Sequence, residues 1–184
     1  IFFAAHLPGV GLYAVYCQTK FNFAVSEVGI FTILNVIAAG SASFVAGKLG
    51  DKFGHKTSMM LAYLGHFIAV LLAIFAQNMF WVYGIFISIG VGQGAFMPSA
   101  MNLIYDFANE RDTKTYMALV DSFLAPFVLL FIMGIGALVQ GSNYTTSLYI
   151  LGTSIILGML ILQFIVRDPK LSAETAFHVD GFSS

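Results

Sequence analysis

Charge is what this sequence has least of. Only 9% of its 184 residues are charged, whereas 59% are hydrophobic. A soluble domain usually carries about 25% charged residues, because its surface faces water. The eight Lys and Arg and the nine Asp and Glu cannot cover a globule of this size. We therefore reject a soluble domain and expect most of the surface to face lipid.

Other scarcities exclude further classes of protein. The net charge of −1 gives no electrostatic support for nucleic-acid binding. The single cysteine, Cys17, cannot form an internal disulfide, so it says nothing about redox compartment. The four histidines lack metal-ligand spacing, and no nucleophile–His pattern is present. We expect no metal, no cofactor and no enzymatic activity.

Long apolar runs are what the sequence has instead. A helix rises about 1.5 Å per residue, so roughly 20 residues cross a hydrocarbon core of about 30 Å. Six stretches reach or approach this length, namely residues 1–17, 28–47, 57–76, 79–105, 116–139 and 145–166. The sequence begins at Ile1 inside the first stretch, without the charged start of a signal peptide, so we expect its natural beginning to be missing. The prediction is an all-α, multi-pass transmembrane six-helix bundle.

Basic residues fix the orientation of the six spans. One set of alternate loops contains only Lys20, and the other set contains the remaining seven, namely Lys48, Lys52, Lys56, Arg111, Lys114, Arg167 and Lys170. Because cytoplasmic loops carry the excess of Lys and Arg, we predict a multi-pass protein of the cell (inner) membrane with both ends in the cytoplasm. Residues 1–170 form the membrane domain, and residues 171–184 form a polar cytoplasmic tail.

The loop between the second and third spans carries a recognisable motif. Residues 47–56 read Gly-Lys-Leu-Gly-Asp-Lys-Phe-Gly-His-Lys. We expect Gly47 to allow close helix packing, and Gly50 and Gly54 to form a tight turn with positive φ. Asp51 can oppose the positive end of a neighbouring helix. The two last lysines of the loop, Lys52 and Lys56, can meet lipid headgroups or acidic side chains. We assign a gating role to this loop through Gly47, Asp51, Lys52, Gly54 and Lys56.

This loop resembles the signature of the major facilitator superfamily, which runs Gly-x-Leu-x-Asp-basic-x-Gly followed by a basic pair. Every defining position is met except the first of the closing pair, where His55 stands. The resemblance implies a fold of twelve spans in two six-helix halves that rock around a central site, of which this chain is one half. The fourth span lacks the Arg usual in the family's N-terminal half, and a short tail follows the sixth span. These features favour the C-terminal half.

Polar residues at membrane depth are the candidates for a solute path, because they are costly unless they face protein or water. We assign His6, Tyr13, Asn35 and Gln93 to this path. Pro8, next to two nearby glycines, can break the first span beside His6. Asn35 can also bond across a helix seam. His66 lies in the third span, which in the resembling family faces lipid, and we leave it outside the site.

Three further polar residues lie toward the cytoplasmic side. Asn102 and Asp106 share one face of the fourth span, since they are four residues apart. Asp121 lies about one turn inside the fifth span, where it can also pair with Lys114 or Arg111. We assign Asn102, Asp106 and Asp121 to a cytoplasmic gate. The Gly90-x-Gly92-x-Gly94 run is expected to pack helices closely rather than to bind phosphate, because it lies inside an apolar span.

The leading functional hypothesis is secondary active transport of a small solute by alternating access. The partners would be membrane lipids, the solute and another six-helix half, which is either in the same chain or in a partner protein. One alternative is a transporter-like scaffold or assembly subunit of a larger membrane complex. Another is a homodimer of this half. The sequence leaves the solute, the direction and the coupling ion open.

Overall fold

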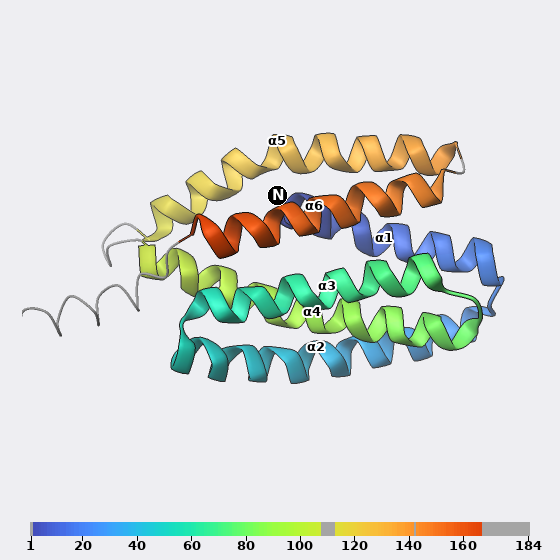
Figure 1. Cartoon of the computed structure of the whole chain (residues 1–184), viewed down its shortest axis with the longest axis horizontal. Coiled ribbons are helices and arrows are strands. Elements are labelled where there is room, and N and C mark those ends of the chain that lie inside the picture. The colour runs from blue at the N-terminus through green and yellow to red at the C-terminus, as the bar shows by residue number, and fades with distance from the viewer. Residues whose placement is uncertain (1, 108–112, 142, 167–184) are drawn as a thin grey trace, which may run out of the picture.

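The computed structural model describes residues 2–107, 113–141 and 143–166, with side chains from residue 10 onward except at positions 25 and 113. These residues form six helices and no strand (Figure 1), which confirms the all-α prediction. The helices are α1 (Phe2–Phe21), α2 (Val25–Phe53), α3 (His55–Phe75), α4 (Met79–Phe107), α5 (Thr113–Gln140) and α6 (Tyr144–Phe164). Each predicted span falls within one helix or overruns it by no more than two residues. The tail at 171–184 lies outside the described residues.

Within the described residues, five helices are long and apolar enough to cross a membrane, namely α2 to α6. The first helix, α1, is continuous from Phe2 to Phe21, so the break expected at Pro8 is not seen. The described residues therefore form a multi-pass bundle in which α2 to α6 are long and apolar enough to span a membrane.

Consecutive helices run in opposite directions, so the connections alternate between the two ends of the bundle (Figure 1). The turn between α2 and α3, which carries Lys52 and Lys56, lies at one end. The connection after α1, which follows Lys20, lies at the other end. The basic loop and Lys20 therefore lie at opposite ends of the bundle, and which end faces the cytoplasm stays a prediction.

The tightest packing joins α2, α3 and α4, and it depends on the glycines of α4. A methyl group at Gly90 would overlap the backbone of Asn35, and one at Gly94 would overlap the backbone of Ala39. On the other side of α4, the backbones of Gly65 and Gly92 meet closely at the crossing with α3. The predicted role of the glycine run in helix packing is confirmed, because only glycine lets these backbones approach so closely.

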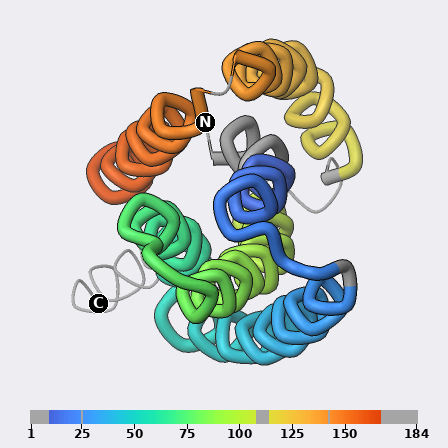
Figure 2. The backbone as a smooth tube through the Cα atoms, turned by 90° about the vertical axis from the view of Figure 1, so that its right-hand side faces the viewer, coloured from blue at the N-terminus to red at the C-terminus, as the bar shows by residue number. Residues whose placement is uncertain are grey.

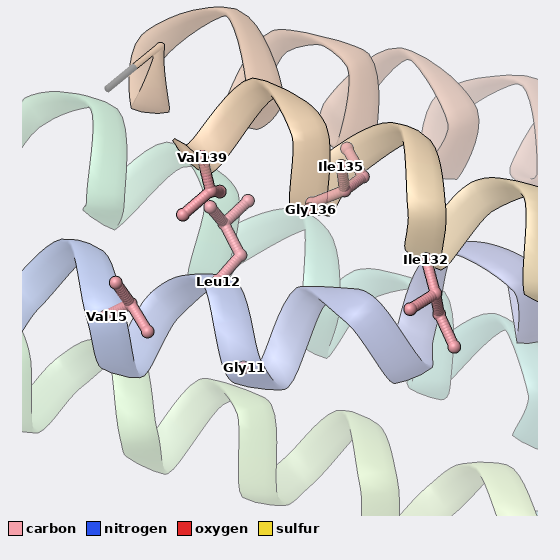
Figure 3. Close-up of a pocket in the computed structure, with 7 residues that line it drawn as sticks. All are labelled: Gly11, Leu12, Val15, Ile132, Ile135, Gly136 and Val139. Carbon is pink, nitrogen blue, oxygen red and sulfur yellow. The ribbon is translucent and has the colours of Figure 1, made fainter. Parts of the chain in front are cut away.

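The packing of α1, α5 and α6 is looser. Tyr16 Oη donates to the Ala73 carbonyl oxygen at 3.1 Å and ties α1 to α3. In contrast, no atom lies within 4 Å of a methyl group built at Gly11 or Gly136. A pocket of about 320 Å³ separates these segments of α1 and α5, with apolar side chains around it (Figure 3). The two seams therefore differ: α2–α4 is closed, whereas α1–α5 is open.

Two long helices are left largely uncovered by the rest of the chain. Only 11% of the apolar window of α2 and 6% of that of α5 is buried within the described residues. Seen along the bundle, α1 occupies the middle, and α2 and α5 lie on either side of it (Figure 2). Lipid or another protein must cover these two apolar surfaces.

Candidate functional site

The signature loop is shorter than the sequence predicts. Helix α2 continues through Gly50 to Phe53, and among the glycines of this loop only Gly54 has a positive φ, at 87°. Gly50 instead makes room for the His55 imidazole and the Ser58 hydroxyl, which a methyl group at Gly50 would overlap. The expectation that Gly50 forms the turn was therefore wrong. Close packing at Gly47 was also wrong, since a methyl group there meets no described atom within 4 Å.

Three contacts hold the loop to its neighbours. Ser58 Oγ donates to the Ala46 carbonyl oxygen at 2.7 Å, which joins α3 to the end of α2. His55 Nε2 lies 3.9 Å from Asp106 Oδ2, which joins α3 to the end of α4. Lys56 Nζ donates to the carbonyl oxygens of Gln163 and Val166 at 2.9 and 2.8 Å.

The Lys56 contacts are a helix cap that sequence reasoning missed. The last carbonyls of a helix have no partner inside it, and a lysine near that end favours the negative end of the helix dipole. Lys56 therefore fastens the C-terminal end of α6 to the signature loop. By contrast, Asp51 and Lys52 lie exposed in the last turn of α2. Their roles in gating stay predictions.

The two amides predicted for the solute path lie in different settings. Asn35 Nδ2 donates to the Phe86 carbonyl oxygen at 3.0 Å, so Asn35 clamps the α2–α4 seam. Gln93 is half-buried near the middle of α4, between the glycines that contact α2 and α3. Within the described part of the chain, its side chain makes no hydrogen bond. The seam bond expected of Asn35 is present, and the solute-path role of both amides stays a prediction.

On α1, Tyr13 is 2% exposed, and its hydroxyl has no hydrogen-bond partner among the described residues. A buried hydroxyl without a partner costs about 1–3 kcal/mol. His6 lies two turns before Tyr13 on the same helix, and its side chain is outside the described part. The Tyr13 hydroxyl therefore lies inside the bundle, and the solute-path roles of Tyr13 and His6 stay predictions.

His66 corrects one expectation. It is 3% exposed and points into the bundle, with its imidazole against the backbone of Gly92. A lipid-facing side chain was expected. The spacing of small residues around it would have indicated burial: Ala62, Ala69 and Ala73 lie four, three and seven residues away and so share its face of α3.

The predicted cytoplasmic gate residues are only partly brought together. Asp106 pairs with His55, and Asn102 is half-buried one turn before it. Asp121 is exposed on α5, and no described cation lies within ion-pair distance of it. Lys114 therefore does not pair with it, and Arg111 lies outside the described residues. A gate that includes Asp121 stays a prediction.

Comparison with known proteins identifies the family. The model of the Major Facilitator Superfamily matches residues 1–181. The chain belongs to the major facilitator superfamily. The match covers all six helices, so membership in this superfamily agrees with the helical fold and with the signature loop.

A second comparison finds similarity to a curated protein that is named as a transporter. The niacin transporter NiaP of Acinetobacter baylyi is 26% identical over 98 residues. This match covers 53% of the chain but 22% of the relative, well under two thirds of its length. The chain thus matches the superfamily model over nearly its whole length and a stretch of a named transporter over about half of its own length.

Proposed function

We propose that this chain is one six-helix half of a secondary transporter that moves a small solute by alternating access. Its cytoplasmic side is the end that carries the signature loop. The other half, in the same protein or in a partner, covers the apolar surfaces of α2 and α5. The exposed surface of these two helices supports this arrangement, because only 11% and 6% of their apolar windows are buried.

The observation that carries the proposal is the Gln93 amide. A half-buried amide near the middle of a span is costly in lipid unless it faces protein or a water-filled path. Within the described part of the chain, no protein group satisfies it. A solute that passes the centre of the membrane would supply the missing hydrogen bonds.

The contrast between the two helix seams supports a moving structure. The α2–α4 seam is fixed by glycine contacts and by the Asn35 bond to Phe86. The α1–α5 seam has a pocket of about 320 Å³ and open space at Gly11 and Gly136. Helix α5 can approach α1 without a steric clash at these glycines, as rocking of one group of helices against another requires.

The test is uptake by the natural full-length protein in liposomes. Niacin is the first solute to try, because it is in the name of the curated relative, followed by a panel of small carboxylates and amides. Gln93→Ala should lower uptake about tenfold, which corresponds to about 1.4 kcal/mol of lost binding. Gln163→Ala is the matched control, since that side chain is exposed near the end of α6.

Two results would contradict the proposal. Uptake that is equal for Gln93→Ala and Gln163→Ala would remove Gln93 from the solute path. Failure of the wild-type protein to transport any solute, together with fixed-stoichiometry copurification with unrelated membrane proteins, would favour a scaffold role instead.

A further inference from the structure

Among the described residues, one His, Asp, Glu, Lys or Arg side chain lies near the middle of the membrane domain, and the proposed function has not used it. His66 is near the midpoint of α3 and is 3% exposed. All other described His, Asp, Glu, Lys and Arg side chains lie in the outer third of a helix or between helices. Ionisable residues at the bilayer centre are costly and mark paths for ions or protons.

The imidazole of His66 contacts the backbone of α4. A methyl group at Gly92 would overlap Nδ1 of His66 and would lie 2.6 Å from its Cε1. The ring therefore rests on the glycine itself, with no side chain between them. Any change in the position or hydration of the ring acts directly on this segment of α4.

The contacted segment also reaches the proposed solute path. Gly92 is next to Gln93, and the flanking Gly90 and Gly94 pack on the α2 backbone at Asn35 and Ala39. Displacement of the His66 ring would thus move the segment of α4 backbone that carries Gln93 and packs against α2. The Asn35 hydrogen bond to the Phe86 carbonyl oxygen also joins α2 to α4 along this contact.

A second buried polar group lies on α1. Tyr13 lies one turn before Tyr16, and His66 lies two turns before Ala73, to whose carbonyl Tyr16 donates. Tyr13 and His66 therefore both lie toward the same end of the bundle from that contact. The Tyr13 hydroxyl is 2% exposed and without a partner among the described residues, so it is a second buried group that can accept or donate a hydrogen bond.

The titratable groups facing this region can be named element by element. Helix α1 contributes Tyr13 and Cys17, and α3 itself contributes Tyr63, which lies against α6. At this depth the described residues of α2, α4 and α6 contribute none. His6 of α1 has an undescribed side chain and is tested separately. Of the groups named, only imidazole ordinarily titrates between pH 5 and 8.

We propose that His66 is the proton-binding site that couples solute movement to a proton gradient. One proton enters from one side of the membrane, binds the imidazole, and leaves to the other side when the access alternates. No covalent bond other than N–H forms or breaks. This proposal rests on the transport function proposed above and names its coupling ion.

The first experiment separates coupling from transport. Liposomes containing the natural full-length protein are loaded with niacin or with another solute found to be transported. His66→Gln should lose uphill accumulation driven by a pH gradient by at least tenfold while it keeps solute exchange at equal pH. His178→Gln, in the tail, should keep both. Uphill accumulation by His66→Gln, or its loss in His6→Gln alone, would overturn the proposal.

The second experiment needs no solute. In the protein labelled with ¹⁵N-histidine in nanodiscs, one set of ring signals should shift between pH 5 and 8 and be missing from His66→Gln. A His66 ring that stays neutral over this whole range would overturn the proposal, even if His66→Gln also disturbs folding. Absence of transport in the wild-type protein would instead refute the transport function, while this titration still decides the proton site.

Discussion

Gly94→Ala in α4 adds only one methyl group, yet it should destabilise the protein strongly. The new methyl would overlap the backbone carbonyl of Ala39, which cannot rotate away as a side chain can. Overpacking typically costs about 1–3 kcal/mol, and the backbone contact places this case at the upper end. Separation of the helices would also weaken the Asn35 bond to Phe86, a loss of about 1 kcal/mol.

The gain in helix propensity from Gly to Ala, about 1 kcal/mol, offsets part of this cost. We therefore expect a net loss of about 2–3 kcal/mol in the free energy of unfolding. Gly40→Ala is the matched control, because it is an exposed interior position of α2 with no atom within 4 Å of the new methyl group. It should be neutral or stabilising by up to about 1 kcal/mol.

The assay is unfolding of the purified protein in bicelles, followed by circular dichroism against increasing SDS. Gly94→Ala should unfold at clearly lower SDS than the wild type, and Gly40→Ala should not. Equal stability of the two variants would refute the closed α2–α4 seam.

Three other predictions test separate contacts. Lys56→Met should speed hydrogen exchange in the last turn of α6 about tenfold, because hydrogen bonds from a charged donor contribute about 1.5–3 kcal/mol. Lys52→Met, at an exposed position, should leave the exchange rate in α6 unchanged. Cys17, which is 0% exposed, should resist N-ethylmaleimide in the folded protein and react after SDS unfolding; rapid labelling of the folded protein would contradict its burial. Asp106→Asn removes the charge that lies 3.9 Å from His55 and should cost under about 1 kcal/mol of stability. In an Asn102→Cys background, the same substitution should increase labelling of the new cysteine by a maleimide added from the cytoplasmic side. Unchanged labelling would show that the His55–Asp106 pair is not part of the gate.

Much of the fold follows from the sequence because lipid imposes a simple rule. Every backbone group in the membrane must be satisfied within the protein, so long uncharged stretches become helices. Charged residues then mark the ends, and Gly54 marks the turn between α2 and α3. The glycine run of α4 was recognised as a packing surface for the same reason: in an apolar span, small residues let helices approach.

The details that the sequence could not predict depend on contacts between distant residues. The partners of Lys56 are more than 100 residues away, and no local pattern points to α6. Gly50 was taken for a turn residue because the motif is rich in glycine, yet its role is to accommodate His55. His66 was placed by analogy toward lipid, although the small residues that share its face indicate a buried position.

Alternating access is the central claim, and Gln93 is the residue at which it is most directly measured. The measurement uses Gln93→Cys in a Cys17→Ala background, in membrane vesicles of known orientation. A membrane-impermeant maleimide should label the new cysteine from either side, with the ratio of the two rates changing when a transported solute is added. Labelling from one side only, under every condition of solute and pH, would contradict the mechanism.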